Sequence, residues 1–120
     1  MNGDIEQFLR ERLDHDEREI RRRWNRHGVT SEKFHGTPFD PTRALAEVGA
    51  KRQILAEVTS EAHYWCEDNW YACAAHVDCA DEDRAGGSCD CGREERVTRK
   101  LRLLALPYAD HPDYREEWRP

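Results

Sequence analysis

The sequence predicts an all-α fold: a small domain of three helices with a long central helix and a cysteine-containing loop. In three separate stretches, apolar residues recur at intervals of three and four, which is the spacing of one helix face. Glycine and proline lie mainly between these stretches, apart from Gly49. The chain has 120 residues, a length that suits a single domain over residues 1–120.

The first helix is expected over about residues 3–25. Its apolar positions are spaced three or four residues apart, so that they share one face of the helix. This face contains Ile5, Phe8, Leu9, Leu13, Ile20 and Trp24. Glycine and proline are frequent over residues 26–39, which are therefore predicted to form a loop.

The central helix is expected over about residues 41–77. Asp40 can accept hydrogen bonds from the first-turn N–H groups, and Pro41 stands at the first helical position, where its missing N–H costs nothing. Between Pro41 and His76, Gly49 is the one helix-breaking residue. The apolar face of this helix contains Leu45, Val48, Leu55, Val58 and Ala62.

A loop, a third helix and a tail are expected to follow. Residues 78–93 combine glycine, cysteine and acidic side chains and are predicted to be a flexible loop. A helix over about residues 94–106 is ended by a proline. Its apolar face contains Val97, Leu101, Leu104 and Ala105. The tail, residues 107–120, is expected to place Tyr114 and Trp118 on one side.

The chain is acidic, with a net charge of −6 at pH 7. This balance argues against non-specific binding to nucleic acid or to an anionic membrane. No stretch approaches the ~18 apolar residues of a membrane span, and the N-terminal residues lack the basic and apolar regions of a secretion signal. We therefore expect a cytoplasmic protein without a membrane association, in which thiols stay reduced.

The hydrophobic core is expected to be small. Leucine, valine, isoleucine and phenylalanine together make up fewer than one residue in five. The mild net charge nevertheless favours a folded chain over a disordered one. A chain of this composition is typically stabilised by an added staple such as a metal ion, or by a partner surface.

All five cysteines and two of the six histidines lie between residues 63 and 91. Reduced thiols and imidazoles at this density indicate a zinc site, and four such ligands without an open position would make it structural. The expected ligands are Cys73, His76, Cys89 and Cys91. The possible substitutes are Cys79, Cys66 and His63.

Other interpretations of these cysteines stay open. They could be redox or regulatory thiols, or they could have no shared role. A catalytic zinc would keep three protein ligands and a water, with a nearby carboxylate as base, and would indicate a metal-dependent hydrolase or nuclease.

The end of the first helix is rich in arginine. These cations could form a phosphate-binding patch for nucleic acid. The preferred interpretation is a solvated face, because Glu17 and Glu19 are close enough to pair with them and cations favour a helix C-terminus. The run consists of Arg18, Arg21, Arg22, Arg23, Arg26 and His27.

Two further polar groups invite a catalytic interpretation. His15 and Asp16 resemble a metal-binding dipeptide of hydrolases, but no supporting histidine lies at a recognisable spacing. The tail could supply an acid and a base, although a polar turn packed under Tyr108, Tyr114 and Trp118 explains it more simply. Its polar residues are Asp110, His111, Asp113, Glu116 and Glu117.

Three segments also resemble a known family. They are LRLLALPYADHPDYREEWRP over residues 101–120, DPTRALAEVGAKRQILA over residues 40–56, and the N-terminal MNGDIEQFLRERLDHDE. They are similar to small uncharacterised proteins of Streptomyces-like actinobacteria and their phages, classed as a domain of unknown function. The resemblance implies a phage or mobile-element origin and implies no activity.

A non-catalytic interaction or regulatory role is the function these observations favour. Four aromatic residues in the central stretch would surround a helix on several sides, which indicates cover by the tail or by a second chain. They are Tyr64, Trp65, Trp70 and Tyr71. We therefore expect a protein partner or a homodimer, bound through a helix and tail surface.

Overall fold

The chain folds into three α-helices and two short 3-10 helices in a computed structural model that describes residues 2–27, 39–61 and 92–120. No strand occurs within these ranges, which confirms the all-α prediction. The helices are α1 (Gly3–His27), α2 (Pro41–Ser60), α3 (Arg93–Ala105), η4 (Leu106–Tyr108) and η5 (Glu116–Trp118).

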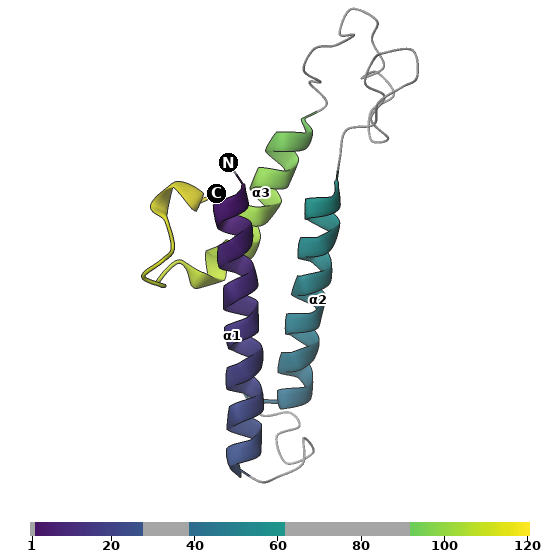
Figure 1. The fold of residues 1–120 in the computed structure, drawn as a ribbon, viewed down its shortest axis with the longest axis vertical. Coiled ribbons are helices and arrows are strands. Elements are labelled where there is room, and N and C mark those ends of the chain that lie inside the picture. The colour runs from purple at the N-terminus through teal and green to yellow at the C-terminus, as the bar shows by residue number, and fades with distance from the viewer. Residues whose placement is uncertain (1, 28–38, 62–91) are drawn as a thin grey trace, which may run out of the picture.

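The helices pack as an antiparallel pair with a third helix across one end (Figure 1). α1 and α2 lie side by side, and α3 contacts both near the N-terminal half of α1 and the C-terminal half of α2. The tail after α3 returns to α1, so that the two chain termini lie close together. Among the described residues, no helix has the length and apolar composition needed to cross a bilayer.

The core lies where the three helices meet. α1 buries the first part of its predicted apolar face, whereas Ile20 and Trp24 are only half-buried because α3 does not reach that far. Trp118 of the tail is buried in the same core. No charged or polar residue is buried in the described part of the chain. The core residues from α1, α2 and α3 are Ile5, Phe8, Leu9, Leu13, Val48, Leu55, Val58, Val97, Leu101 and Ala105, and Pro41 at the start of α2 is also buried.

α2 begins as the sequence predicts. The carboxylate of Asp40 accepts hydrogen bonds from the backbone N–H groups of Thr42 at 3.1 Å and Arg43 at 3.3 Å. Pro41 occupies the first helical position, where its fixed φ is compatible with the helix. These contacts satisfy two of the N–H groups that a helix start leaves without partners.

α2 ends earlier than the predicted helix over residues 41–77. Glu61 has an extended backbone, with φ −62° and ψ 121°, and its N–H donates to the carbonyl of Val58 at 3.3 Å. The hydroxyls of Thr59 and Ser60 donate to carbonyls of the preceding turn, which is the competing hydrogen bonding typical of these residues. The remainder of the predicted helix lies outside the described residues.

α3 begins at Arg93, directly after Gly92, whose φ of 79° lies in the left-handed region that favours glycine. Its predicted apolar face is largely buried, with Leu101 and Ala105 fully inaccessible. The helix continues into η4, where Pro107 no longer has an N–H to extend the hydrogen-bond ladder.

Candidate functional site

The predicted zinc ligands all lie outside the described residues. This holds for Cys73, His76, Cys89 and Cys91, and equally for the substitutes Cys79, Cys66 and His63. In the described ranges no group of three or more His, Cys, Asp and Glu side chains is arranged to hold a metal ion. The zinc site therefore stays a prediction.

The two ends of the cysteine-containing segment meet at Glu61. Arg93 donates from Nε to the Glu61 carbonyl oxygen at 2.6 Å, and the guanidinium of Arg96 binds the Glu61 carboxylate at 2.9 and 3.1 Å. Lys100 adds a weaker contact at 3.5 Å. The hydrogen bond from Arg96 holds the pKa of Glu61 below its usual value, with Lys100 contributing through its charge. The end of α2 and the start of α3, which flank residues 62–91 in the sequence, are thus joined by a charged junction.

Three arginines of the run at the end of α1 have partners within the protein. Arg21 pairs with Glu17 at 3.1 Å and Arg22 pairs with Glu19 at 2.5 Å, as the sequence predicts. The guanidinium of Arg23 lies 4.1 Å from the centre of the Phe39 ring. Arg18 and Arg26 are exposed, and the side chain of His27 lies outside the described residues.

Asp16 has a partner in the tail that the sequence did not reveal. The hydroxyl of Tyr108 donates to its carboxylate at 2.6 Å, whereas His15 lies only at the limit of an ion pair, 4.0 Å away. Burial, followed by this hydrogen bond, raises the pKa of Tyr108 well above its usual value. The dipeptide His15-Asp16 therefore connects α1 to the tail.

The tail is held on α1 by aromatic rings that surround Phe8. The centre of the Phe8 ring lies 5.1 Å from that of Trp118, 5.7 Å from that of His111, and 6.2 Å from those of Tyr108 and Tyr114. Tyr114 and Trp118 contact each other edge to face at 5.7 Å, in agreement with their predicted placement on one side. The tail thus completes the core over the N-terminal half of α1.

The polar tail residues serve mainly to fix this packing. Both ring nitrogens of His111 face donors: Nε2 faces the guanidinium of Arg12, and Nδ1 accepts from the N–H of Asp113 at 3.1 Å. A neutral imidazole can accept at only one of its nitrogens, so one of these donors is left unsatisfied by the ring. Two of the tail carboxylates form exposed pairs, Glu116 with Arg119 and Glu117 with Arg115.

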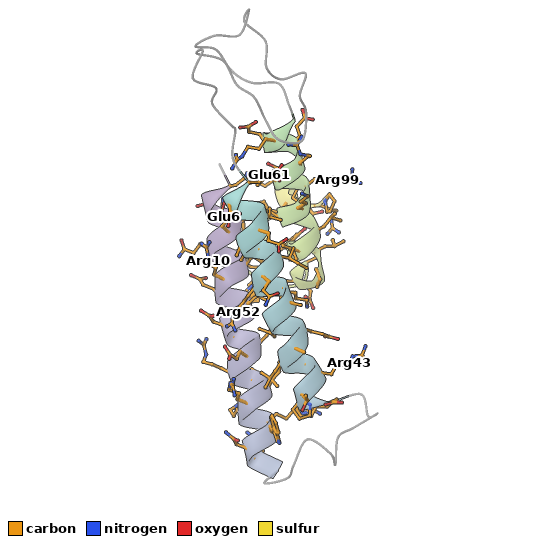
Figure 2. All side chains as sticks on the ribbon, turned by 90° about the vertical axis from the view of Figure 1, so that its right-hand side faces the viewer. Glu6, Arg10, Arg43, Arg52, Glu61 and Arg99 are labelled. Carbon is orange, nitrogen blue, oxygen red and sulfur yellow. The ribbon has the colours of Figure 1, made fainter. Side chains whose placement is uncertain are left out.

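The outward side of α3 presents apolar and cationic side chains to solvent. We call the set of Arg99, Arg102, Leu103 and Leu106 the α3 outer face. Leu103 is 49% exposed and Leu106 is 39% exposed. Figure 2 shows Arg99 extending from α3 on the side away from α1. An open hollow of about 570 Å³ adjoins this face, and Pro120 of the tail also lines it.

The α3 outer face was not predicted from the sequence, because the apolar stripe that was predicted for this helix is the one that became part of the core. Leu103 and Leu106 stand beside that stripe rather than in it. The spacing of residues 99, 102, 103 and 106 by three and four would have revealed a second stripe on the same helix.

A family model described as a family of unknown function, DUF6221, matches residues 2–120. It bears out the resemblance to a domain of unknown function across nearly the whole chain, and it does not test an actinobacterial or phage origin. Neither the curated proteins nor the solved structures yielded a match.

Proposed function

We propose that this chain, which belongs to the DUF6221 family of unknown function, is a non-catalytic interaction protein that binds a protein partner through the α3 outer face and the adjoining chain end. The observation behind this proposal is the exposure of Leu103 in α3 and Leu106 at the start of η4, three residues apart on one continuous helical backbone. Single exposed apolar residues are ordinary, whereas an apolar pair with flanking arginines beside a hollow is typical of a docking surface.

The small core supports this choice of surface. An aliphatic side chain that α3 exposes to solvent cannot contribute to the core, which already contains few such residues. Both leucines are already about half buried, so their full burial in a complex would contribute about 0.6–1.5 kcal/mol per side chain. A partner surface would therefore add to the stability of a chain whose core is small.

The proposal includes a structural zinc held by the cysteine-containing segment, with Cys73, His76, Cys89 and Cys91 as ligands. The junction at Glu61 supports it, because a segment whose two ends are held together needs less additional ordering to close around an ion. If the ligands were three with a water in the fourth position, a hydrolase or nuclease activity would replace this structural role.

Nucleic-acid binding through the arginine run is less favoured. Arg21 and Arg22 are neutralised by carboxylates of their own helix, and Arg23 is stacked on Phe39. A phosphate would have to compete with these contacts and with the net charge of −6.

The proposed function can be tested by expressing the full chain and two variants in native cells. The cell extracts are then separated by size-exclusion chromatography. Leu103→Asp places a charge on the α3 outer face. Ile54→Asp makes the same chemical change at a residue of α2 that is 46% exposed. We expect the wild type and Ile54→Asp to elute as a complex larger than the free chain and Leu103→Asp to elute as the free chain. Circular dichroism checks that both variants are folded.

Two results would contradict the proposal. One is a wild-type chain that elutes free under gentle extraction. The other is a complex that Leu103→Asp leaves intact, because partner binding would then not involve this face.

A further inference from the structure

We propose that the occupant of the α3 outer face is an amphipathic helix of a partner protein that presents carboxylates beside its apolar stripe. This inference rests on the proposed function and adds the chemical class of the partner segment. It follows from the order of apolar, cationic and acidic side chains along α3.

The apolar part of the face has the geometry of a helix-binding ridge. Leu103 and Leu106 are three residues apart on a continuous helical backbone, since Leu106 itself has helical angles of φ −54° and ψ −39°. Two such side chains form one ridge that fits between the ridges of a second helix. A partner helix would meet it with apolar residues spaced three, four and seven apart.

The cations of the face lack partners among the described residues. Three of the five cationic residues of α3 are engaged: Arg93 and Arg96 bind Glu61, and Lys100 approaches it. Arg99 and Arg102 form no ion pair with any described carboxylate. A carboxylate brought beside them while the leucines are buried would form a pair partly shielded from water, which favours acidic partners over basic ones.

The hollow gives the partner helix a direction. At the N-terminal end of α3 its lining is acidic, with Glu94 and Glu95, and towards the C-terminal end it contains Arg99 and Arg102. Pro120 also lines the hollow. The carboxylates of the partner helix therefore belong opposite the arginines, and its opposite end should be neutral or basic where it passes Glu95.

A second copy of this chain fits the face less well. A two-fold axis through this face would set its leucines against the leucines of the other copy and its arginines against the other arginines, so that cations meet cations. The four residues of the face include no carboxylate to separate these cations, because Glu94 and Glu95 lie towards the other end of the hollow. The observations therefore favour a different protein.

The test is selection of binders from a displayed library of helical peptides. The library has a fixed apolar stripe at positions i, i+3, i+4 and i+7 and random flanking residues. Full-length protein is the target, and Leu103→Asp protein removes peptides that bind elsewhere. We expect the surviving peptides to be enriched in Asp and Glu. We also expect Arg99→Glu together with Arg102→Glu to weaken them by tenfold or more, about 1.4 kcal/mol or more, and Arg43→Glu to leave affinity unchanged.

The outcomes separate this inference from the proposed function. Surviving peptides without acidic enrichment, or with basic enrichment, would overturn the acidic class while leaving the surface as a docking site. Failure to recover any peptide sensitive to Leu103→Asp would overturn both. A wild-type dimer in analytical ultracentrifugation that Leu103→Asp dissociates would identify a second copy as the occupant and overturn the inference.

Discussion

Phe8 connects the tail to the helices at the scale of single residues. It is 5% exposed and contacts four rings contributed by η4, η5 and the turn between them. Aromatic pairs of this kind stabilise beyond their buried area by about 0.5–1.5 kcal/mol each. Phe8 is therefore the aromatic centre of the contact between α1 and residues 107–120, beside the hydrogen bonds of Asp16 and Arg12.

Phe8→Ala should lower the free energy of unfolding by about 3–5 kcal/mol, because it leaves a cavity under the tail. Phe8→Leu keeps most of the volume and should cost about 1 kcal/mol. Urea unfolding followed by circular dichroism measures both. Equal and small losses for the two variants would mean that the tail is not packed on Phe8.

Tyr108→Phe should remove part of the alkaline sensitivity of the fold. The folded state holds the pKa of Tyr108 above the ordinary value of 10.0, so the unfolded chain loses this proton first. The contribution to stability is present below about pH 10 and declines as the pH rises above it. The wild type should be more stable than Tyr108→Phe by about 1–2 kcal/mol at neutral pH, and this difference should shrink above about pH 10. A difference that stays constant would contradict the hydrogen bond to Asp16.

The sequence predicted the placement of tail side chains better than it predicted the residues of α1 that they contact. Tyr114 and Trp118 could be placed on one side from their spacing. Asp16 and Tyr108 are 92 positions apart, and no local pattern connects a carboxylate on α1 to a hydroxyl after α3. Such contacts depend on how the helices pack, which a single sequence does not specify.

At the scale of elements, the junction at Glu61 joins the end of α2 to the start of α3. Arg93 and Arg96 bind its carbonyl and its carboxylate. Its side chain is 25% exposed, so solvent screens these pairs only in part. The junction determines where the cysteine-containing segment leaves and rejoins the helices.

Glu61→Gln should destabilise the protein by about 1 kcal/mol at neutral pH. The pKa of Glu61 is lowered in the folded state, so its contribution is present above the ordinary value of 4.5 and is lost as the pH falls through and below that value. Thermal unfolding at about pH 7 and about pH 3 should therefore show the two proteins differing at the higher pH and converging at the lower one. A difference of the same size at both values would exclude the ion pair as its cause.

Cys89→Ser combined with Cys91→Ser should lower the melting temperature of the zinc-loaded protein. The same double variant should melt like the wild type after chelation, because the ion is then absent from both. Differential scanning calorimetry with and without a chelator makes the comparison. Identical melting curves under both conditions would remove the zinc proposal.

The two ends of the central helix differ in how well the sequence predicts them. Its start was predictable, because Asp40 and Pro41 act locally. Its end was not predictable. Thr59 and Ser60 are tolerated inside helices, and they end this helix only together with the hydrogen bonds from Arg93 and Arg96 to Glu61. A boundary set by a tertiary contact has no local signal.

At the scale of the whole molecule, the fold class and the buried stripes could be predicted because each helix buries one apolar face, whose spacing is visible in the sequence. The α3 outer face could not, because exposure is decided by which side of a helix the neighbours cover. Leu103 and Leu104 are adjacent in sequence, yet Leu104 packs against the core and Leu103 is half exposed. The surface proposed for partner binding is thus a property of the assembled helices.

The most direct measurement is photocrosslinking in native cells from a benzophenone side chain placed at residue 99, with residue 43 as the control. Figure 2 shows both Arg99 and Arg43 extending outward from different helices. If a partner binds at the α3 outer face, we expect a discrete crosslinked protein from position 99 that Leu103→Asp abolishes, and none from position 43. Equal crosslinking from both positions, or none from position 99, would contradict partner binding at the α3 outer face.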